Sequence, residues 1–300
     1  MTLSLPTGPA RLVAIAIIVW AVQPFTAGEL LGAALDGADD PFRTTVSIGA
    51  WAAWGLVLIA IAVPRPVTLT ISRLGAAGGT AAATWAAFDV AGDPAADRAI
   101  IIVGVVAAAV ATFCIHLPGI GDRFVDGISY GDERRFLLRA PGPVLLFLIG
   151  PATAIVLAGV AAGPLLLADE RWGAGAILTI VGWLVAWLPL NALHRLTARF
   201  VVFVPNGLVV HDRGVIREPV LFVKREIAGL APAPSDTVAT DFTSQALGLA
   251  LELRLASPVE LPVVTGRTTT EEQTVRSLLL APTRPGAVMH TAVERGITIA

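Results

Sequence analysis

The stretch Ile120–Pro143, IGDRFVDGISYGDERRFLLRAPGP, is the one long polar interval in the first two thirds of this 300-residue chain. Four long apolar segments precede it and two follow it, and the pattern changes to short apolar runs after residue 199. Each long segment has about 20 residues, which is the length that a helix needs to cross a bilayer. Backbone amides in lipid must be satisfied within the segment, so each one is expected to be helical. The sequence therefore predicts an α-helical membrane bundle of six transmembrane helices followed by a smaller C-terminal domain.

The overall composition agrees with this prediction. Hydrophobic residues make up 55% of the chain and charged residues 15%, and the mean hydropathy is +0.75, whereas an ordinary globular chain is about 25% charged. The six expected spans are Leu12–Leu35, Thr45–Val63, Val67–Val90, Ala99–Leu117, Val144–Leu167 and Gly173–Leu193. The formal net charge of −2 is too small to indicate a nucleic-acid partner.

The arginines predict the orientation in the membrane, because cytoplasmic loops are enriched in basic residues. With the N-terminus inside, nine arginines fall on the inner side: Arg11, Arg65, Arg73, Arg123, Arg134, Arg135, Arg139, Arg195 and Arg199. Three fall outside: Arg43, Arg98 and Arg171. An even number of spans returns the chain to the inner side, so both termini are expected in the cytoplasm. The expected domains are residues 1–198, with a cytoplasmic loop at 118–143, and residues 199–300.

The polar interval mixes charges of both signs with apolar side chains. Its candidate interaction residues are Arg123, Asp132, Glu133, Arg134, Arg135 and Arg139. Interleaved apolar residues would suit an element at the membrane surface, but the balanced charge argues against strong binding to anionic lipid. Two readings remain open, a docking site for the C-terminal domain and a solvated cytoplasmic turn.

Glu29 is the one acidic residue well inside an expected span, and it follows Pro24, where a helix kink is expected. A charge at the membrane centre costs about 2.5–3.5 kcal/mol on insertion scales, so such residues are often functional. Glu29 lies about six residues from the outer end, however, and could also reach the interface. It is the candidate intramembrane polar site.

Residues 199–300 read as an α+β domain. Phe200–Val204 and Leu208–His211 flank Pro205-Asn206-Gly207, and Asn-Gly between apolar runs predicts a β-hairpin. Further strands are expected at Val220–Val223, at Leu247–Leu255 and at Val259–Val264, with the second of these alternating between leucines and other residues. Two terminal helices are expected, one after Thr268 and one from about Pro285 to Arg295, before Gly296.

The segments RFVVFVPNGLVVHD (199–212) and LGLALELRL (247–255), with the helix expected after Thr268, resemble the bacterial PH-like domains that are attached to membrane helices. This resemblance covers about 100 of the 300 residues and implies an antiparallel PH-like sheet or barrel. The six-span part resembles multi-pass integral membrane proteins of actinobacteria, which carry no activity over to this chain. Residues 199–300 contain equal numbers of basic and acidic residues, so the phosphoinositide ligand of other PH-like domains is not expected here.

Motifs of enzymatic chemistry are missing from the sequence, including phosphate-binding loops, HExxH, CxxC and GxSxG. No cofactor and no metal is therefore expected. The favoured hypothesis is a non-enzymatic protein of the bacterial plasma membrane that presents its cytoplasmic domain to a protein partner or to a second copy, as an assembly or regulatory factor of the cell envelope. One alternative is a small transporter or channel that uses Glu29. Another is an intramembrane lipid-modifying enzyme that uses Asp122, Asp126, Asp132 or Glu133.

Overall fold

The computed structural model describes residues 8–94, 97–266 and 269–299 and divides into two compact units. The first unit consists of Met1–Arg123 and Gly150–His194, and the second of Phe124–Ile149 and Arg195–Ala300. The chain therefore passes between the units three times. The expected division after residue 198 differs from this arrangement, because Phe124–Ile149 belongs with the C-terminal residues.

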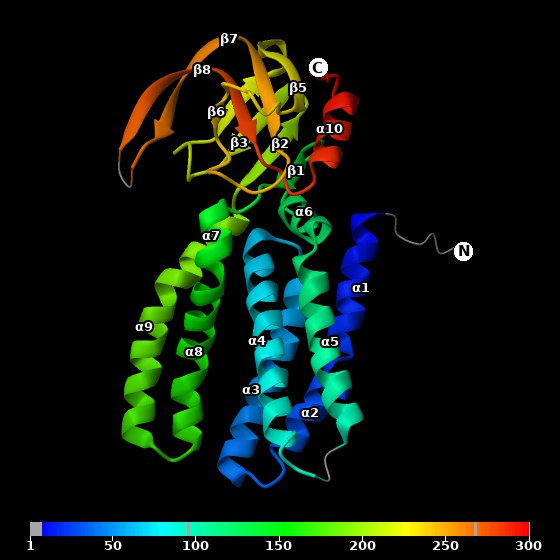
Figure 1. The fold of residues 1–300 in the computed structure, drawn as a ribbon, viewed down its shortest axis with the longest axis vertical. Helices are drawn as coiled ribbons and strands as arrows, with labels where there is room; N and C mark the ends of the chain where they lie inside the picture. Colours follow the sequence, from blue (N-terminus) through cyan, green and yellow to red (C-terminus); the bar gives the residue numbers. More distant parts are fainter. Residues whose placement is uncertain (1–7, 95–96, 267–268, 300) are drawn as a thin grey trace, which may run out of the picture. The chain divides into compact units, whose positions relative to one another are not determined.

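The first unit is helical (Figure 1). Its elements are α1 (Pro9–Ala21), η1 (Gln23–Phe25), α2 (Ala27–Ala34), α3 (Asp40–Ala62), α4 (Pro66–Val90), α5 (Arg98–His116), α8 (Ile149–Ala168) and α9 (Trp172–Thr197). The expected fifth span, Val144–Leu167, is divided: it starts in the short helix Gly142–Phe147 of the second unit and continues in the helix Ile149–Ala168. The short helix η1 interrupts the first span at Gln23-Pro24, where proline removes a helix hydrogen bond. α6 (Pro118–Asp126) leads from this unit into the second.

Five helices among the described residues are long and apolar enough to cross a membrane: Ala10–Ala34, Asp40–Ala62, Arg98–His116, Ile149–Ala168 and Trp172–Thr197. In each of the five helices, only 11–22% of an apolar 18-residue stretch is buried. Most of these apolar side chains therefore need a non-aqueous surrounding. The five helices are compatible with a multi-pass membrane protein. The helix α4, which contains Arg73 and a run of Gly, Ala and Thr, is not one of the five.

Small residues let the helices of the first unit approach closely. A Cβ atom on Gly75 of α4 would collide with Val57 of α3, and one on Gly79 would lie 3.4 Å from the ring of Trp20. Gly75 and Gly79 thus serve packing within the chain. In the hairpin of α8 and α9, a Cβ on Gly159 would lie 2.5 Å from the carbonyl oxygen of Gly182.

The second unit contains two four-stranded sheets and a C-terminal helix. The first sheet has the order β1-β2-β3-β4 and is antiparallel throughout, with β1 (Arg134–Leu137), β2 (Phe200–Val204), β3 (Gly207–His211) and β4 (Val220–Val223). The second has the order β5-β7-β8-β6, with β5 (Ile227–Pro232), β6 (Thr240–Asp241), β7 (Leu251–Val264) and β8 (Thr270–Leu280). The helices are α7 (Gly142–Phe147), η2 (Lys224–Glu226) and α10 (Pro285–Glu294).

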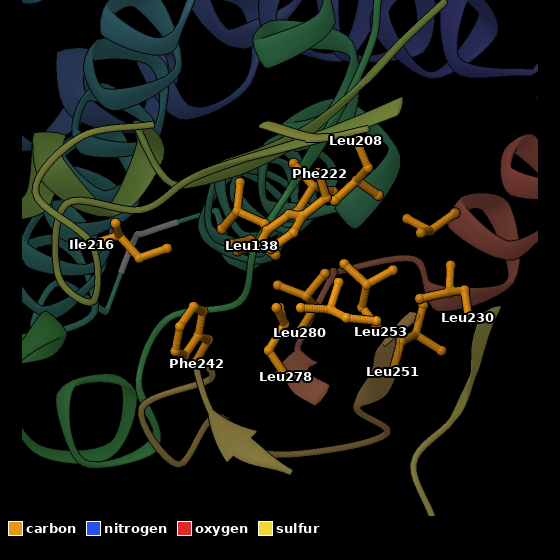
Figure 2. Packing of buried hydrophobic residues seen from close by; sticks show 14 of the residues in the cluster. Leu138, Leu208, Ile216, Phe222, Leu230, Phe242, Leu251, Leu253, Leu278 and Leu280 are labelled. Atoms are coloured by element: carbon orange, nitrogen blue, oxygen red, sulfur yellow. The ribbon is translucent and has the colours of Figure 1, made fainter. Parts of the chain in front are cut away.

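One apolar core joins the elements of the second unit (Figure 2). Leu208 and Phe222 of the first sheet and Leu251 and Leu278 of the second belong to this core, and all four side chains are fully buried. Phe136 and Leu138 add side chains from the polar interval to this core. Phe136 packs edge-on against Phe203, with their ring centroids 5.9 Å apart.

Several expected elements of the C-terminal residues are confirmed. β2 and β3 form the expected hairpin around Asn206-Gly207, β4 has the expected bounds, and α10 ends before Gly296 with a left-handed φ of 67°. Val259–Val264 is a strand, but it continues β7 without a break.

Two expectations for this region are wrong. The first terminal helix is instead the strand β8, whose Val275, Leu278 and Leu280 face the core through pairing with β7; Thr268 itself lies outside the described residues. The strand expected from Leu247 begins only at Leu251. The backbone of Gly248 has a left-handed φ of 99°, which takes residues 247–249 out of the strand.

Candidate functional site

The central candidate residues lie on or beside β1, which joins the edge of the first sheet. β1 pairs with β2 in antiparallel register, with Arg135 opposite Val202 and Leu137 opposite Phe200. After β1 the chain continues along both sheets, since the N–H of Leu138 donates to the carbonyl of Arg199 at 2.9 Å and that of Arg139 donates to Ala281 at 2.8 Å. One part of the polar interval, β1, is thus a strand of the second unit.

Asp126 organises the turn that precedes β1. Its Oδ2 atom lies 2.9 Å from Nη1 of Arg134, and its Oδ1 atom accepts hydrogen bonds from the backbone of Arg135 and from the hydroxyl of Ser129, both at 3.0 Å. The carboxylate therefore closes the loop between α6 and β1. Arg134 remains more than half exposed on the other side of this ion pair.

Arg135 is held between a carboxylate and an aromatic ring. Its Nη2 atom lies 2.7 Å from Oε2 of Glu133, and its guanidinium carbon lies 5.3 Å from the centroid of the Phe200 ring, a distance at which a cation–π attraction operates. Phe200 in turn stacks on His211 with centroids 4.5 Å apart. The hydrogen bond from Arg135 is the main cause that lowers the pKa of Glu133, and the backbone N–H of Tyr130 contributes to the same effect.

Arg139 binds backbone rather than acidic groups. Its Nη1 atom donates to the carbonyl of Leu249 at 2.9 Å and to that of Leu247 at 3.2 Å. Its own carbonyl oxygen accepts a hydrogen bond from Nη1 of Arg199 at 3.0 Å. Arg139 therefore connects the end of the polar interval to the loop before β7 and to the start of β2.

The remaining candidates lie apart from this group. Arg123 is half-buried in α6 and is the last residue of the first unit. Asp132 has an exposed side chain, and its carbonyl accepts from the guanidinium of Arg295. Glu29 lies in the first turn of α2 and is exposed. The structure brings together Glu133, Arg134 and Arg135, but not the whole set.

The sequence reasoning missed the buried partner of Arg199. The distribution of arginines indicates only a charge near the membrane at this position, yet Arg199 forms an ion pair with Asp212 at 2.6 Å. The spacing of 13 residues across a predicted hairpin places the two side chains on facing strands, which was the available signal.

Several polar side chains within the first unit bond to a neighbouring helix, while others bond to the backbone of their own helix. Nε2 of Gln23 donates to the carbonyl of Ala107 in α5 at 3.1 Å, and the hydroxyls of Thr80 and Thr112 lie 2.7 Å apart. Trp20 and Trp54 each donate their indole N–H to the carbonyl of the other, at 2.9 and 3.0 Å. In the described part of the chain, no three His, Cys, Asp or Glu side chains lie together as a metal site requires. These hydrogen bonds hold helices together.

Comparison with known proteins gives no further identification. No protein-family model matches the chain, and neither a curated protein nor a solved structure shows significant similarity to it.

Proposed function

We propose that this protein is a non-enzymatic integral membrane protein that holds a cytoplasmic PH-like module at the bacterial plasma membrane and presents it to a protein partner. In this proposal α4 crosses the membrane as a sixth span, with Arg73 reaching the inner headgroups from its place near one helix end. Six spans and the arginine distribution put both termini in the cytoplasm.

The observation that carries the proposal is the threefold connection between the helices and the β unit. The chain crosses between the units at residues 123–124, 149–150 and 194–195. Since β1 from the middle of the chain pairs with β2 from its C-terminal part, the module is connected to the helices by three chain segments. Such a connection suits a module that is presented to a partner at the membrane.

The contacts of the polar interval favour a structural role over a catalytic one. Asp126 is paired with Arg134 and Glu133 with Arg135, and the side chain of Asp132 is exposed. Glu133 has a lowered pKa, and both Glu133 and Asp126 already bind arginines, which disfavours general acid catalysis by these two residues. Asp122, the fourth carboxylate of the enzyme alternative, is buried. The exposed position of Glu29 likewise gives little support to a transport site.

The outer edge of β4 is the surface that we assign to the partner. β4 ends the order of the first sheet, and Leu221 on this strand is 47% exposed. An edge strand offers backbone hydrogen bonds, and an exposed apolar side chain adds specificity to strand addition. A partner segment, or the same strand of a second copy, would extend the sheet there.

The test is crosslinking in intact cells followed by purification of the full-length protein in mild detergent. We expect a partner, or a second copy, at a constant ratio that the Leu221→Arg variant loses and the Val238→Arg variant keeps; Val238 is fully exposed but lies outside β4. Recovery of a monomer without any crosslinked protein would contradict the proposal.

A further inference from the structure

The segment before β7 exposes two leucines although its backbone is firmly held. Leu247 and Leu249, on either side of Gly248, are 52% and 50% exposed. We call residues 245–249, QALGL, the leucine loop. Its exposure to water calls for a physical explanation, because burial of a leucine is favourable.

Side chains from two other places fix the backbone of the leucine loop. Asp241 accepts from the N–H of Thr243 at 2.7 Å and from that of Gln245 at 3.2 Å. Arg139 binds the carbonyls of Leu247 and Leu249. The loop is therefore built to hold its leucines outward, whereas a mobile loop could fold them inward.

The leucine loop is continuous with the apolar surface of α7. The N–H of Gly142, the first residue of α7, donates to the carbonyl of Gln245 at 3.2 Å, and a Cβ atom on Gly142 would lie 3.5 Å from the side chain of Leu247. The apolar residues Leu145, Leu146, Phe147 and Leu148 are 48–70% exposed. We call the leucine loop and the adjoining residues 142–148 together the apolar patch.

The α7 part of this patch is close in the chain to a candidate span. The candidate span α8 begins at Ile149, two residues after α7 ends. With a helical rise of 1.5 Å per residue, Gly142 lies only about 10 Å from the start of α8 along the chain. Interfacial apolar helices reach about 5–10 Å into the boundary between headgroups and acyl chains. The patch therefore lies within reach of that boundary.

The charge beside the patch suits the same surrounding. Among the residues that the structure describes, no carboxylate lies within ion-pair distance of Arg139, whose guanidinium binds carbonyls. A cation without an acidic partner at headgroup depth is attracted to lipid phosphates.

We propose that the leucine loop and α7 form an additional membrane contact, in which Leu247 and Leu249 insert into the headgroup–acyl boundary of the bilayer. The occupant of this apolar patch is lipid. The contact orients the module through a fourth point of attachment that is not covalent, and it does not depend on the protein partner proposed for β4.

Depth-dependent fluorescence in lipid nanodiscs tests this inference on the full-length protein. In a Cys114→Ala background, which removes the native cysteine, single cysteines at positions 249, 221 and 238 are labelled with an environment-sensitive nitrobenzoxadiazole dye. Leu221 matches Leu249 in residue type and exposure, and Val238 is fully exposed. The nanodiscs contain phosphatidylcholine and phosphatidylglycerol, with or without lipids that carry a nitroxide on the acyl chain.

We expect a blue-shifted emission at position 249 and a loss of its intensity with the acyl nitroxide. The label at 238 should keep the emission of dye in water, and the label at 221 should not be quenched by the acyl nitroxide, whether or not a second copy covers β4. Equal quenching by the acyl nitroxide at the three positions, or quenching at 249 by aqueous iodide alone, would overturn the inference. A second measurement uses the unaltered chain with a lipid that carries a photoreactive diazirine on its acyl chain. Adducts are expected on the leucine loop, and their absence there would equally overturn the inference.

Discussion

Arg199 and Asp212 form a buried ion pair in which Nη2 of Arg199 lies 2.6 Å from Oδ2 of Asp212. The two side chains are only 8% and 1% exposed. Nε of Arg199 donates to the same oxygen at 2.9 Å, and Oδ1 of Asp212 accepts from the N–H of Gly214 at 3.0 Å. The pair therefore connects Arg199, the residue before β2, to the turn after β3. Arg199 lies two residues beyond the end of α9.

Removal of one member of this pair is expected to destabilise the β unit strongly. Asp212→Asn leaves the charge of Arg199 buried without compensation, which costs about 3–5 kcal/mol. Hydrogen exchange of the β2 and β3 amides should then accelerate about a hundredfold or more if they exchange by opening of the unit. The double variant Arg199→Met with Asp212→Leu should restore much of the protection, because it leaves no buried charge. Equal exchange in Asp212→Asn and the unaltered protein would show that the pair contributes little.

The ion pair between Arg135 and Glu133 predicts a small pH dependence. Its hydrogen bond lowers the pKa of Glu133 in the folded protein below the ordinary value of 4.5. The stabilisation is therefore fully present above pH 4.5 and decreases as the pH falls through the lowered pKa. Because the pair is partly exposed, its contribution is about 1 kcal/mol or less. Thermal unfolding followed by circular dichroism from pH 7 to 3.5 should show a smaller loss below pH 4.5 in Glu133→Gln, and the same loss in both proteins would contradict the assignment.

The close approach of α8 and α9 predicts a sharp difference between two glycines of the same helix. Gly159→Ala would place a methyl group 2.5 Å from the carbonyl of Gly182 and should cost about 1–3 kcal/mol through overpacking. At Gly150, also in α8, a Cβ atom meets nothing within 4 Å. Gly150→Ala should thus be neutral or stabilising, since alanine favours a helix. Loss of helical signal on titration with sodium dodecyl sulfate compares the two variants, and equal midpoints would contradict the packing.

Replacement of Glu29 provides a direct test of the transporter alternative. The described part of the chain does not cover the side chain of Glu29 on α2, so Glu29→Gln removes little packing. With the carboxylate at the membrane interface, the stability should change by no more than about 0.5 kcal/mol. Under the proposed non-transport function, proton and cation fluxes of reconstituted liposomes should be the same for both proteins. A flux that the unaltered protein supports and the variant loses would favour the transporter.

Local patterns predicted the elements whose structure depends on neighbouring residues. The β2–β3 hairpin follows from Asn206-Gly207, and α10 follows from Pro285 at its start and Gly296 after its end. The alternation of leucines gave a wrong start for β7, because contacts with residues distant in the sequence determine where this strand begins. Leu247 and Leu249 continue the alternation of β7, but Arg139, more than 100 residues earlier, binds their carbonyls and holds them in a loop.

The segment after Thr269 shows how tertiary pairing overrides a local signal. The spacing of Val275 and Leu278 suits one face of a helix. The segment is nevertheless a strand, because it pairs with β7: Leu280 lies opposite Leu251 at one end and Thr270 lies opposite Val264 at the other. The candidate interaction residues were found for their charge. The ion pairs that involve Glu133, Arg134 and Arg135 could not be predicted, because nothing in the sequence of RRFL shows that it pairs with β2.

Phe136 tests whether the polar interval is an integral part of the β unit. It is 5% exposed in the core and packs against Phe203, which lies 67 residues later in the numbering. Phe136→Ala should cost about 3–5 kcal/mol, as expected for a buried phenylalanine, and should weaken the amide protection of β2 and β3 as well as that of β1. Tyr130 supplies the matched control, because it is an aromatic residue of the same interval with 87% exposure. Tyr130→Ala should leave the protection unchanged. If Phe136→Ala exposed only the amides of β1, the interval would be a surface attachment, and the module would not depend on the middle of the chain for its fold.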